Sequence, residues 1–385
     1  MTRPKGIDLD QYKTQAKELL KQVRAKQPEA FERIRQHHPE HESLINFGKI
    51  RLADVQLVLA RENGFSSWTK FKQFLLFRNG IAAIADGDLE RLRLLLDENP
   101  WLARYKCRTG DLYENGYFAG ATLLHHIAGN PGDALVGPLP PNIIDIARLL
   151  INYGFEKESG NYTISLLLTS SQASRRGVAM PLIDLLIAGG AELDINKPGL
   201  LNEPLGNEAP ETARELIRRG AKIDIRHAAA LGQLDLVKQM VNRDESLKSN
   251  LSLIPLSHNP HEAKKQLEQA FFGACMGGQT DVAEFLLGQG VDPTAQQGGQ
   301  TGFHYAAHMG HLNTVKMLLR RKVPLEVINM YNGTVLGQAI WSAFNEPKPD
   351  HPAIIETLIS AGAEIRPNWN KWINELRQRA KAGSS

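Results

Sequence analysis

Apolar side chains in residues 299–319, GQTGFHYAAHMGHLNTVKMLL, recur at helical spacing on both sides of one glycine. Thr301 can begin the first helix, because its hydroxyl can accept a backbone N–H that the first turn leaves unpaired. Gly310 can separate the helices, because glycine readily adopts positive φ. The pattern therefore predicts two short amphipathic helices that need neighbours to cover them. Their apolar positions are Phe303, Ala306, Ala307, Val315, Leu318 and Leu319.

The apolar pair of the second helix returns along the chain. A spacing of 32 residues separates Leu286 from Leu318, and 33 residues separate Thr301 from Thr334. A period of this length predicts stacked repeats rather than one closed core, and we count eight imperfect units, with the unit near residues 197–224 the hardest to phase. The pairs are Leu95-Leu96, Leu150-Ile151, Leu186-Ile187, Leu216-Ile217, Met240-Val241, Leu286-Leu287, Leu318-Leu319 and Leu358-Ile359.

The motif T-G-F-H-Y-A-A-x-x-G-H-x-x-x-V-x-x-L-L over residues 301–319 resembles the ankyrin repeat. That repeat is marked by T-P-L-H-x-A, followed by G-H and V-x-x-L-L. The sequence departs from it at Gly302, where Pro is usual, and at Lys322-Val323, where the repeat normally ends in Gly-Ala. The resemblance implies an all-α ankyrin-repeat solenoid of about eight helix-turn-helix units with helical caps at both ends. Since most of the family binds proteins, it also implies a binding scaffold for another protein.

The segment before the repeats is also patterned for helices. An apolar stripe runs from Tyr12 to Val23, Pro28 can begin a second helix, and Asn63-Gly64 can end a third. Because the open end of a stack needs cover, we expect Phe65, Trp68 and Phe71 to pack at the first repeat. The predicted parts are a basic helical capping segment over residues 1–78, ankyrin-like repeats over 79–366, and a capping helix and tail over 367–385.

Length and composition argue against a single closed core, a disulfide-rich protein and a membrane protein. The chain has 385 residues, beyond the roughly 250–300 that one core usually serves, and its net charge is only +3. Its two cysteines, Cys107 and Cys275, fall in distant repeats, which favours a reducing compartment. No apolar run approaches the roughly 18 residues of a membrane span. We therefore expect a cytoplasmic protein that does not contact membranes.

Signatures of catalysis and metal binding are weak. The sequence has no G-x-S-x-G, no G-x-x-x-x-G-K-[ST] and no H-E-x-x-H motif. His304 and His308 have the spacing of two metal ligands on one helix, but no third ligand is evident. We expect a non-enzymatic protein with no cofactor and no metal.

The resemblance also implies a binding surface. In ankyrin-like units, the residue after the motif histidine and the two before the turn glycine face a concave groove. Applied to this chain, that register gives His126, Asn130, His227, Leu231, Met276, Tyr305, His308, Met309, Gln338 and Trp341. The connector at residues 106–118 would add a finger loop that carries Tyr113, Asn115 and Tyr117. Aromatic, Met and His side chains in such a row are typical of recognition hot spots.

Two alternatives remain at this point. Residues 1–80 hold 15 Lys and Arg against 9 Asp and Glu, so basic helices there could bind nucleic acid through Lys13, Lys17, Lys21 and Arg24. The same residues also fit an ordinary solvated helix face. The second alternative is a small-molecule or enzymatic site in the groove, covered by the insertion at residues 242–265.

Overall fold

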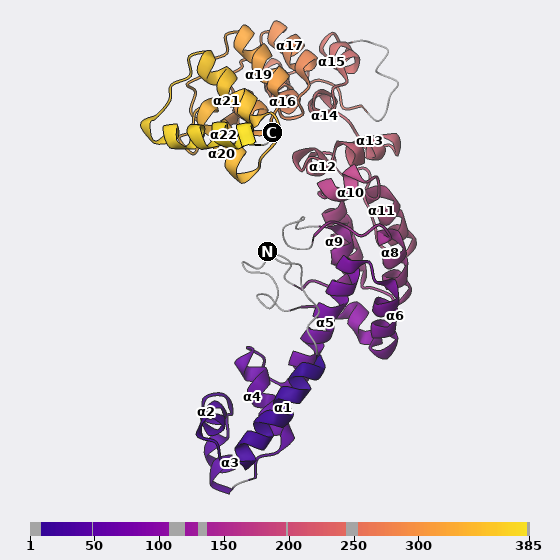
Figure 1. The fold of residues 1–385 in the computed structure, drawn as a ribbon. Helices are drawn as coiled ribbons and strands as arrows, with labels where there is room; N and C mark the ends of the chain where they lie inside the picture. The colour runs from indigo at the N-terminus through magenta and orange to yellow at the C-terminus, as the bar shows by residue number, and fades with distance from the viewer. Residues whose placement is uncertain are drawn as a thin grey trace. The chain divides into compact units, whose positions relative to one another are not determined.

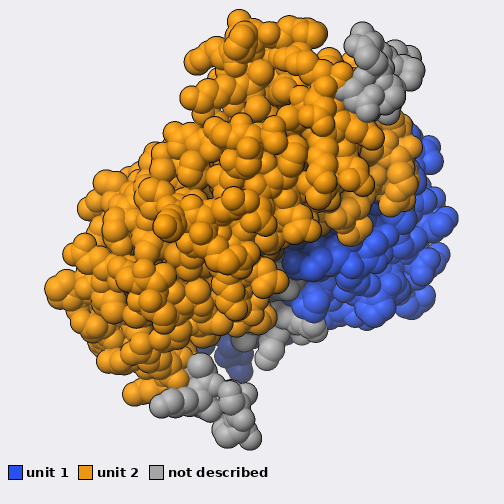
Figure 2. All heavy atoms as spheres, turned by 90° about the horizontal axis from the view of Figure 1, so that it is seen from above, with its two compact units in different colours: residues 1–193 blue, residues 194–385 orange. Residues whose placement is uncertain are grey.

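The computed structural model describes residues 9–47, 49–107, 120–129, 137–197, 199–243 and 253–382. These residues are mostly helical, and their one sheet is a hairpin of β1 (Gln296–Gln297) and β2 (Gln300–Thr301), which confirms the all-α prediction. Contacts between Cα atoms divide the chain into two compact units, Met1–Leu193 and Asp194–Ser385 (Figure 2). None of the helices in the described ranges is long and apolar enough to cross a membrane.

The amino-terminal segment has its own small core. Its helices are α1 (Leu9–Arg24), α2 (Pro28–His37), α3 (His41–Phe47) and α4 (Leu52–Glu62). The predicted apolar stripe of α1 faces α4, and α2 packs on the same helix. Pro28 begins α2 as predicted, and Gly64 ends α4 with φ of 82°. The buried core consists of Ala16, Leu19, Leu20, Val23, Ala30, Ile34, Val55, Val58 and Leu59.

A single helix joins this segment to the first repeat. α5 (Trp68–Asp86) begins at Ser67, whose side chain accepts the Lys70 N–H, and ends at Gly87 with φ of 72°. The boundary expected at residue 78 therefore falls inside α5. The rings of Phe65 and Phe71 lie 5.2 Å apart, so Phe65 packs on α5, the first helix of the first repeat.

The described residues form eight helix pairs, as the period predicts, and the predicted apolar pairs all fall in the second helix. Unit 1 contains α5 with α6 (Leu89–Glu98), η3 (Leu123–Ala128) with α8 (Ile143–Asn152), and α9 (Lys157–Leu168) with α11 (Ala179–Ala188). Unit 2 contains α12 (Asn202–Gly206) with α13 (Pro210–Arg218), α14 (Ile225–Ala230) with α15 (Leu234–Val241), α16 (Pro260–Met276) with α17 (Thr280–Gly288), α18 (Gly302–His308) with α19 (Leu312–Arg320), and α20 (Val335–Asn345) with α21 (His351–Ser360). The connectors include η1 (Pro100–Arg104) and α10 (Ser171–Arg175).

A capping box formed by Thr301 and His304 fixes the start of α18. The Thr301 hydroxyl accepts the His304 N–H, and the Thr301 N–H donates to His304 Nδ1 at 3.3 Å. His304 Nε2 then donates to Gly333 O in the next repeat at 3.2 Å. Because the ring is fully buried, desolvation lowers the pKa of His304 and keeps it neutral, as both bonds require. The motif histidine is therefore an internal strut.

The carboxy-terminal end is covered by η5 (Pro367–Trp369) and α22 (Asn370–Ala382), which packs on α20 and α21 (Figure 1). Trp369, Ile373 and Leu376 are buried there. This arrangement matches the role expected of a carboxy-terminal capping helix. It also brings Trp372 of α22 to Phe344 of α20, the first helix of the last repeat, with ring centroids 6.3 Å apart.

Candidate functional site

A row of ring side chains crosses three successive first helices of unit 2. Phe272 of α16 contacts Tyr305 of α18 edge to face, with ring centroids 4.6 Å apart. The Tyr305 and His308 centroids lie 6.0 Å apart, and those of His308 and Trp341 of α20 lie 6.2 Å apart. We call Phe272, Tyr305, His308 and Trp341 the aromatic row. Because α16 packs on α18 and α18 packs on α20, the rings form one continuous surface.

The row ends in a partly open cavity of about 650 Å³, which we call the Trp341 pocket. Four of the predicted groove residues line it: Tyr305, His308, Gln338 and Trp341. The connector between α19 and α20 contributes Tyr331, and the carboxy-terminal cap contributes Trp369 and Trp372. The structure therefore brings together the carboxy-terminal part of the predicted row.

A hydrogen-bond network holds one wall of this pocket. The Ser342 hydroxyl donates to Gln338 O at 2.8 Å, and His308 Nδ1 lies 2.8 Å from Ser342 Oγ. Gln338 Oε1 accepts from Asn329 Nδ2 at 3.0 Å. These bonds fix side chains from α18, α20 and the connector before any ligand arrives.

Large apolar side chains around the pocket are exposed. Tyr331 is 74% exposed and Met330 is 64% exposed, while Trp341 and Trp372 are 48% and 43% exposed. Burying such rings against a partner is favourable at roughly 25 cal/mol per Å² of apolar surface. A cluster of this kind on a folded surface is typical of an interaction site.

Two charged side chains line the Trp341 pocket. Glu346 Oε2 lies 3.5 Å from His308 Nε2, and the Glu346 side chain is about half exposed. Arg366 donates from Nη1 to Asn332 O at 2.9 Å, and its guanidinium lies 5.0 Å from the centroid of the Trp369 ring. The pocket therefore combines aromatic faces with one anion and one already committed cation.

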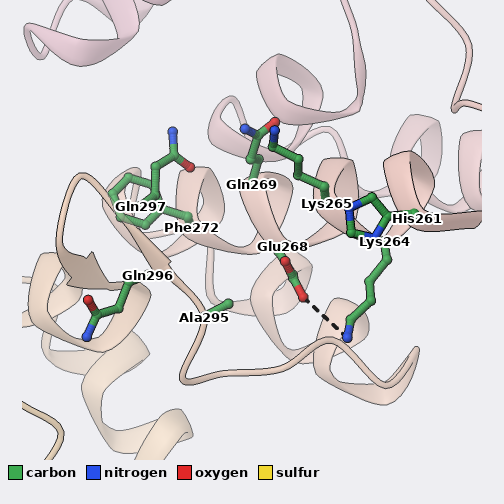
Figure 3. A pocket seen from close by; sticks show the side chains of 9 residues that line it. All are labelled: His261, Lys264, Lys265, Glu268, Gln269, Phe272, Ala295, Gln296 and Gln297. Carbon is green, nitrogen blue, oxygen red and sulfur yellow. Dashed lines mark ion pairs between the residues drawn. The ribbon is translucent and has the colours of Figure 1, made fainter.

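A second cavity of about 410 Å³ lies at the α16 end of the row (Figure 3). Phe272 lines it together with the basic side chains of His261, Lys264 and Lys265, and with Gln296 and Gln297 of the hairpin. The dashed line in Figure 3 joins Lys264 Nζ to Glu268 Oε1 at 3.8 Å. Because Phe272 also contacts Tyr305, the aromatic row connects this more basic end to the Trp341 pocket.

Four residues predicted for the groove are buried. Gln338, 8% exposed, still lines the Trp341 pocket, whereas the other three line neither cavity. His227 is 3% exposed, Leu231 is 6% exposed and His126 is 1% exposed. His227 accepts the Asp224 N–H at Nδ1, just as His304 accepts that of Thr301, so it is the motif histidine and not the residue after it. His126 Nδ1 donates a hydrogen bond to Thr122 O at 3.0 Å. The Phe77 ring packs against the His126 ring, with centroids 6.0 Å apart. Assigning these three residues to a partner surface was wrong.

The remaining predicted residues have mixed positions. Met276 and Met309 are half-buried and do not line either cavity. Asn130, Tyr113, Asn115 and Tyr117 lie outside the described residues. The finger loop and its three residues therefore remain predictions.

Sequence reasoning missed several residues of the site. Phe272 stands 32 residues before His304, at the position of the internal histidine, so the period indicated a buried side chain. Trp369 and Trp372 were expected only to pack the cap. The Met330-Tyr331 dipeptide, two apolar residues before Asn332-Gly333 in a turn, was the one signal that could have identified the exposed connector.

The basic stripe of α1 is exposed but partly neutralised. Lys13 Nζ lies 2.7 Å from Asp10 Oδ1, and Lys21 Nζ lies 3.9 Å from Glu18 Oε2. Lys17 and Arg24 share the same exposed face. This arrangement favours a solvated helix face. Within the described ranges, no group of three or more His, Cys, Asp and Glu side chains is placed to hold a metal ion.

Comparisons with known proteins bear on the fold. A family model of ankyrin repeats in three copies matches residues 225–323 and 271–368. The crystal structure of the human ASB11 ankyrin repeat domain aligns with 74% of this chain and 99% of its own at 15% identity and a TM-score of 0.27. No curated protein gives a match. Ankyrin repeats are generally protein–protein interaction modules. The family-model match covers the helix pairs from α14 to α21, which carry the motif at residues 301–319, so residues 225–368 match the ankyrin-repeat family.

Proposed function

We propose that this protein is a non-enzymatic binding scaffold whose aromatic row and Trp341 pocket hold a segment of another protein. The observation that carries the proposal is the continuous surface of partly exposed rings from Phe272 to Trp341 across three stacked helices. Aromatic side chains supply large contact areas at little entropic cost and are enriched in binding hot spots.

Rigidity of the groove supports this role. The Thr301–His304 capping box fixes the start of α18, and the Gln338–Ser342 network fixes the wall of the pocket. Because these groups are ordered before binding, little conformational entropy remains to oppose association.

A protein segment fits the site better than an enclosed small molecule. The cavity of about 650 Å³ is within the usual range for small ligands. However, the most exposed large apolar residues of the region are Tyr331, which lines the cavity, and Met330, which does not. A small ligand in the cavity would leave Met330 in water, whereas an extended partner can cover both side chains.

Ser342 lies behind the pocket lining beside His308 and Glu346, so the residue types of a catalytic triad are close together, but their arrangement does not support catalysis. Ser342 is fully buried, and its hydroxyl donates to Gln338 O. His308 Nδ1 is directed to that buried hydroxyl, and Glu346 lies near the other ring nitrogen. A nucleophile must reach the substrate, which this serine cannot do. The geometry therefore supports binding.

The proposal places the protein in the cytoplasm. Cys107 and Cys275 are both buried and neither forms a disulfide, as expected in a reducing compartment.

A peptide-display library selected against the full chain tests the proposal. We expect an enriched motif whose peptides bind the wild type and lose at least tenfold in affinity to Trp341→Ala and to Tyr305→Ala. Trp101→Ala is the matched control, because Trp101 is an exposed tryptophan of η1 outside the aromatic row. Selected peptides that bind Trp341→Ala and Tyr305→Ala as tightly as the wild type would refute the proposed groove.

A further inference from the structure

We propose that the Trp341 pocket recognises a cationic side chain, lysine or arginine, of the partner segment. This inference rests on the proposed function and specifies the chemistry of the residue that enters the pocket. It is carried by three independent features of the pocket: half-exposed tryptophan rings, an anionic group and a buried acceptor without a partner among the described residues.

The aromatic faces come from two elements. Trp341 of α20 and Trp372 of α22 both line the pocket and are about half exposed. A cation over an indole face is attracted by the ring quadrupole, and tryptophan is the strongest such partner. Rings of this region already hold cations elsewhere, since Arg366 lies over Trp369 and Arg379 over Phe344. Among the described cations, none lies over Trp341 or Trp372.

The anion is Glu346, at the end of α20. Its carboxylate lines the pocket and has His308 Nε2 within 3.5 Å. No Lys or Arg of the described residues forms an ion pair with it. A carboxylate beside aromatic faces attracts a cation and gives no comparable advantage to a neutral side chain.

The unpartnered acceptor is Gln300 on β2. Its Oε1 atom is buried and has no hydrogen-bond partner within the described part of the chain, and the residue lines the same pocket. A buried acceptor without a donor costs free energy, and a ligand N–H group would recover it when the Gln300 amide turns toward the pocket on binding. Lysine and arginine carry several N–H donors and no acceptor on their charged ends. Their chemistry therefore fits both Gln300 and Glu346.

Arg366 is the opposing charge on the pocket wall. Its bond to Asn332 O and its stacking on Trp369 hold it at that ring, so Trp341 and Trp372 stay open. It would still repel a second cation. We therefore expect Arg366→Gln to tighten the binding of a cationic probe about twofold or more, the opposite of the effect of removing Glu346.

The test follows the tryptophan indole N–H signals of the full chain by NMR. The probes are the Nα-acetyl methylamides of lysine, of arginine and of norleucine, a neutral side chain with the carbon skeleton of lysine. Trp341→Phe and Trp372→Phe assign the two signals. We expect both signals to move with lysine and arginine, and the apparent affinity for norleucine to be at least threefold weaker.

Two variants distinguish recognition of the positive charge from nonspecific apolar binding. Glu346→Gln should weaken binding of the lysine probe at least threefold, whereas Glu364→Gln, an exposed carboxylate that does not line the pocket, should leave it unchanged. Equal shifts with norleucine, or no loss in Glu346→Gln, would overturn the inference.

The proposed function and this inference can fail separately. If selected peptides depend on Trp341 but carry no lysine or arginine, the groove stands and cation recognition is wrong. If the lysine probe binds in the Trp341 pocket but the library yields no groove-dependent peptide, cation recognition stands and the scaffold proposal is wrong.

Discussion

The residue after the motif histidine has opposite roles in the two units. In unit 1 this residue is His126, which is 1% exposed and covered by the ring of Phe77 from α5. In unit 2 it is Tyr305, which is half-buried, contacts Phe272 at its edge and lines the Trp341 pocket. The position in the repeat is the same, and the neighbouring helix decides whether the side chain is core or surface. Repeat register alone therefore does not define a binding groove.

The largest effect should come from charge placed between stacked helices. Leu318 is fully buried in α19, whereas Leu319 is only half-buried. We expect Leu318→Asp to cost several kcal/mol and to unfold the repeats around α19, because a buried carboxylate there has no partner. Leu319→Asp is the control and should cost much less. Thermal melting by circular dichroism measures both, and a Leu318→Asp curve equal to that of the wild type would contradict the packing.

Acid should destabilise unit 1 through its buried histidine pair. Burial lowers the pKa of His125 and of His126 to about 4, from 6.5 in the unfolded chain. The unfolded chain therefore binds these protons first, and the stability is fully present above pH 6.5 and is lost as the pH falls toward 4. The loss should be on the order of a few kcal/mol.

Melting temperatures between pH 7.5 and 4.5 check this prediction. A variant with His125→Asn and His126→Asn should show a smaller decrease over that range than the wild type. The same pH slope in both proteins would show that the pair does not cause it.

Paired alanine variants test the contrast between core and surface directly. Trp341→Ala should weaken binding of a selected peptide at least tenfold while stability changes by about 0.5 kcal/mol or less. His126→Ala should do the reverse, with a loss of about 1–3 kcal/mol in stability and unchanged binding. Calorimetric unfolding measures the change in stability of each variant, and peptide titration measures its change in affinity. If both variants weakened peptide binding equally, Trp341 would not be a surface residue for binding in contrast to a buried His126.

The smallest effect is expected at the basic stripe of α1. Reversing Lys13, Lys17 and Lys21 to Glu should leave binding of the selected peptide unchanged, because these side chains lie on a solvated helix face. A titration with duplex DNA at two salt concentrations tests the alternative. Tight binding that weakens steeply with salt and disappears in the triple variant would favour nucleic-acid recognition instead.

Sequence periodicity predicted the fold because stacking imposes the same burial in every unit. Leu286 and Leu318 recur 32 residues apart and are both fully buried, and Gly310 adopts the predicted positive φ of 78°. The helix start at Thr301 and the turn at Gly310 depend on residues close in the sequence. They could therefore be inferred without knowledge of the three-dimensional neighbours.

The surface was harder to predict because exposure depends on distant residues. His126 is covered by Phe77, which lies 49 residues earlier, and no local pattern signals that contact. Trp372 lines the Trp341 pocket because α22 packs on α20, an arrangement set by tertiary contacts. Tyr305, His308, Gln338 and Trp341 all line the Trp341 pocket, and their repeats follow the family register closely, but their role in binding remains a prediction.

The most direct test of the groove is the indole N–H spectrum of the full chain during titration with a library-selected peptide. The chain has five tryptophans, so the signals can be assigned by single Trp→Phe variants. We predict that the signals of Trp341 and Trp372 shift with saturation while that of Trp101 does not move. A peptide that binds but shifts neither Trp341 nor Trp372 would contradict the account.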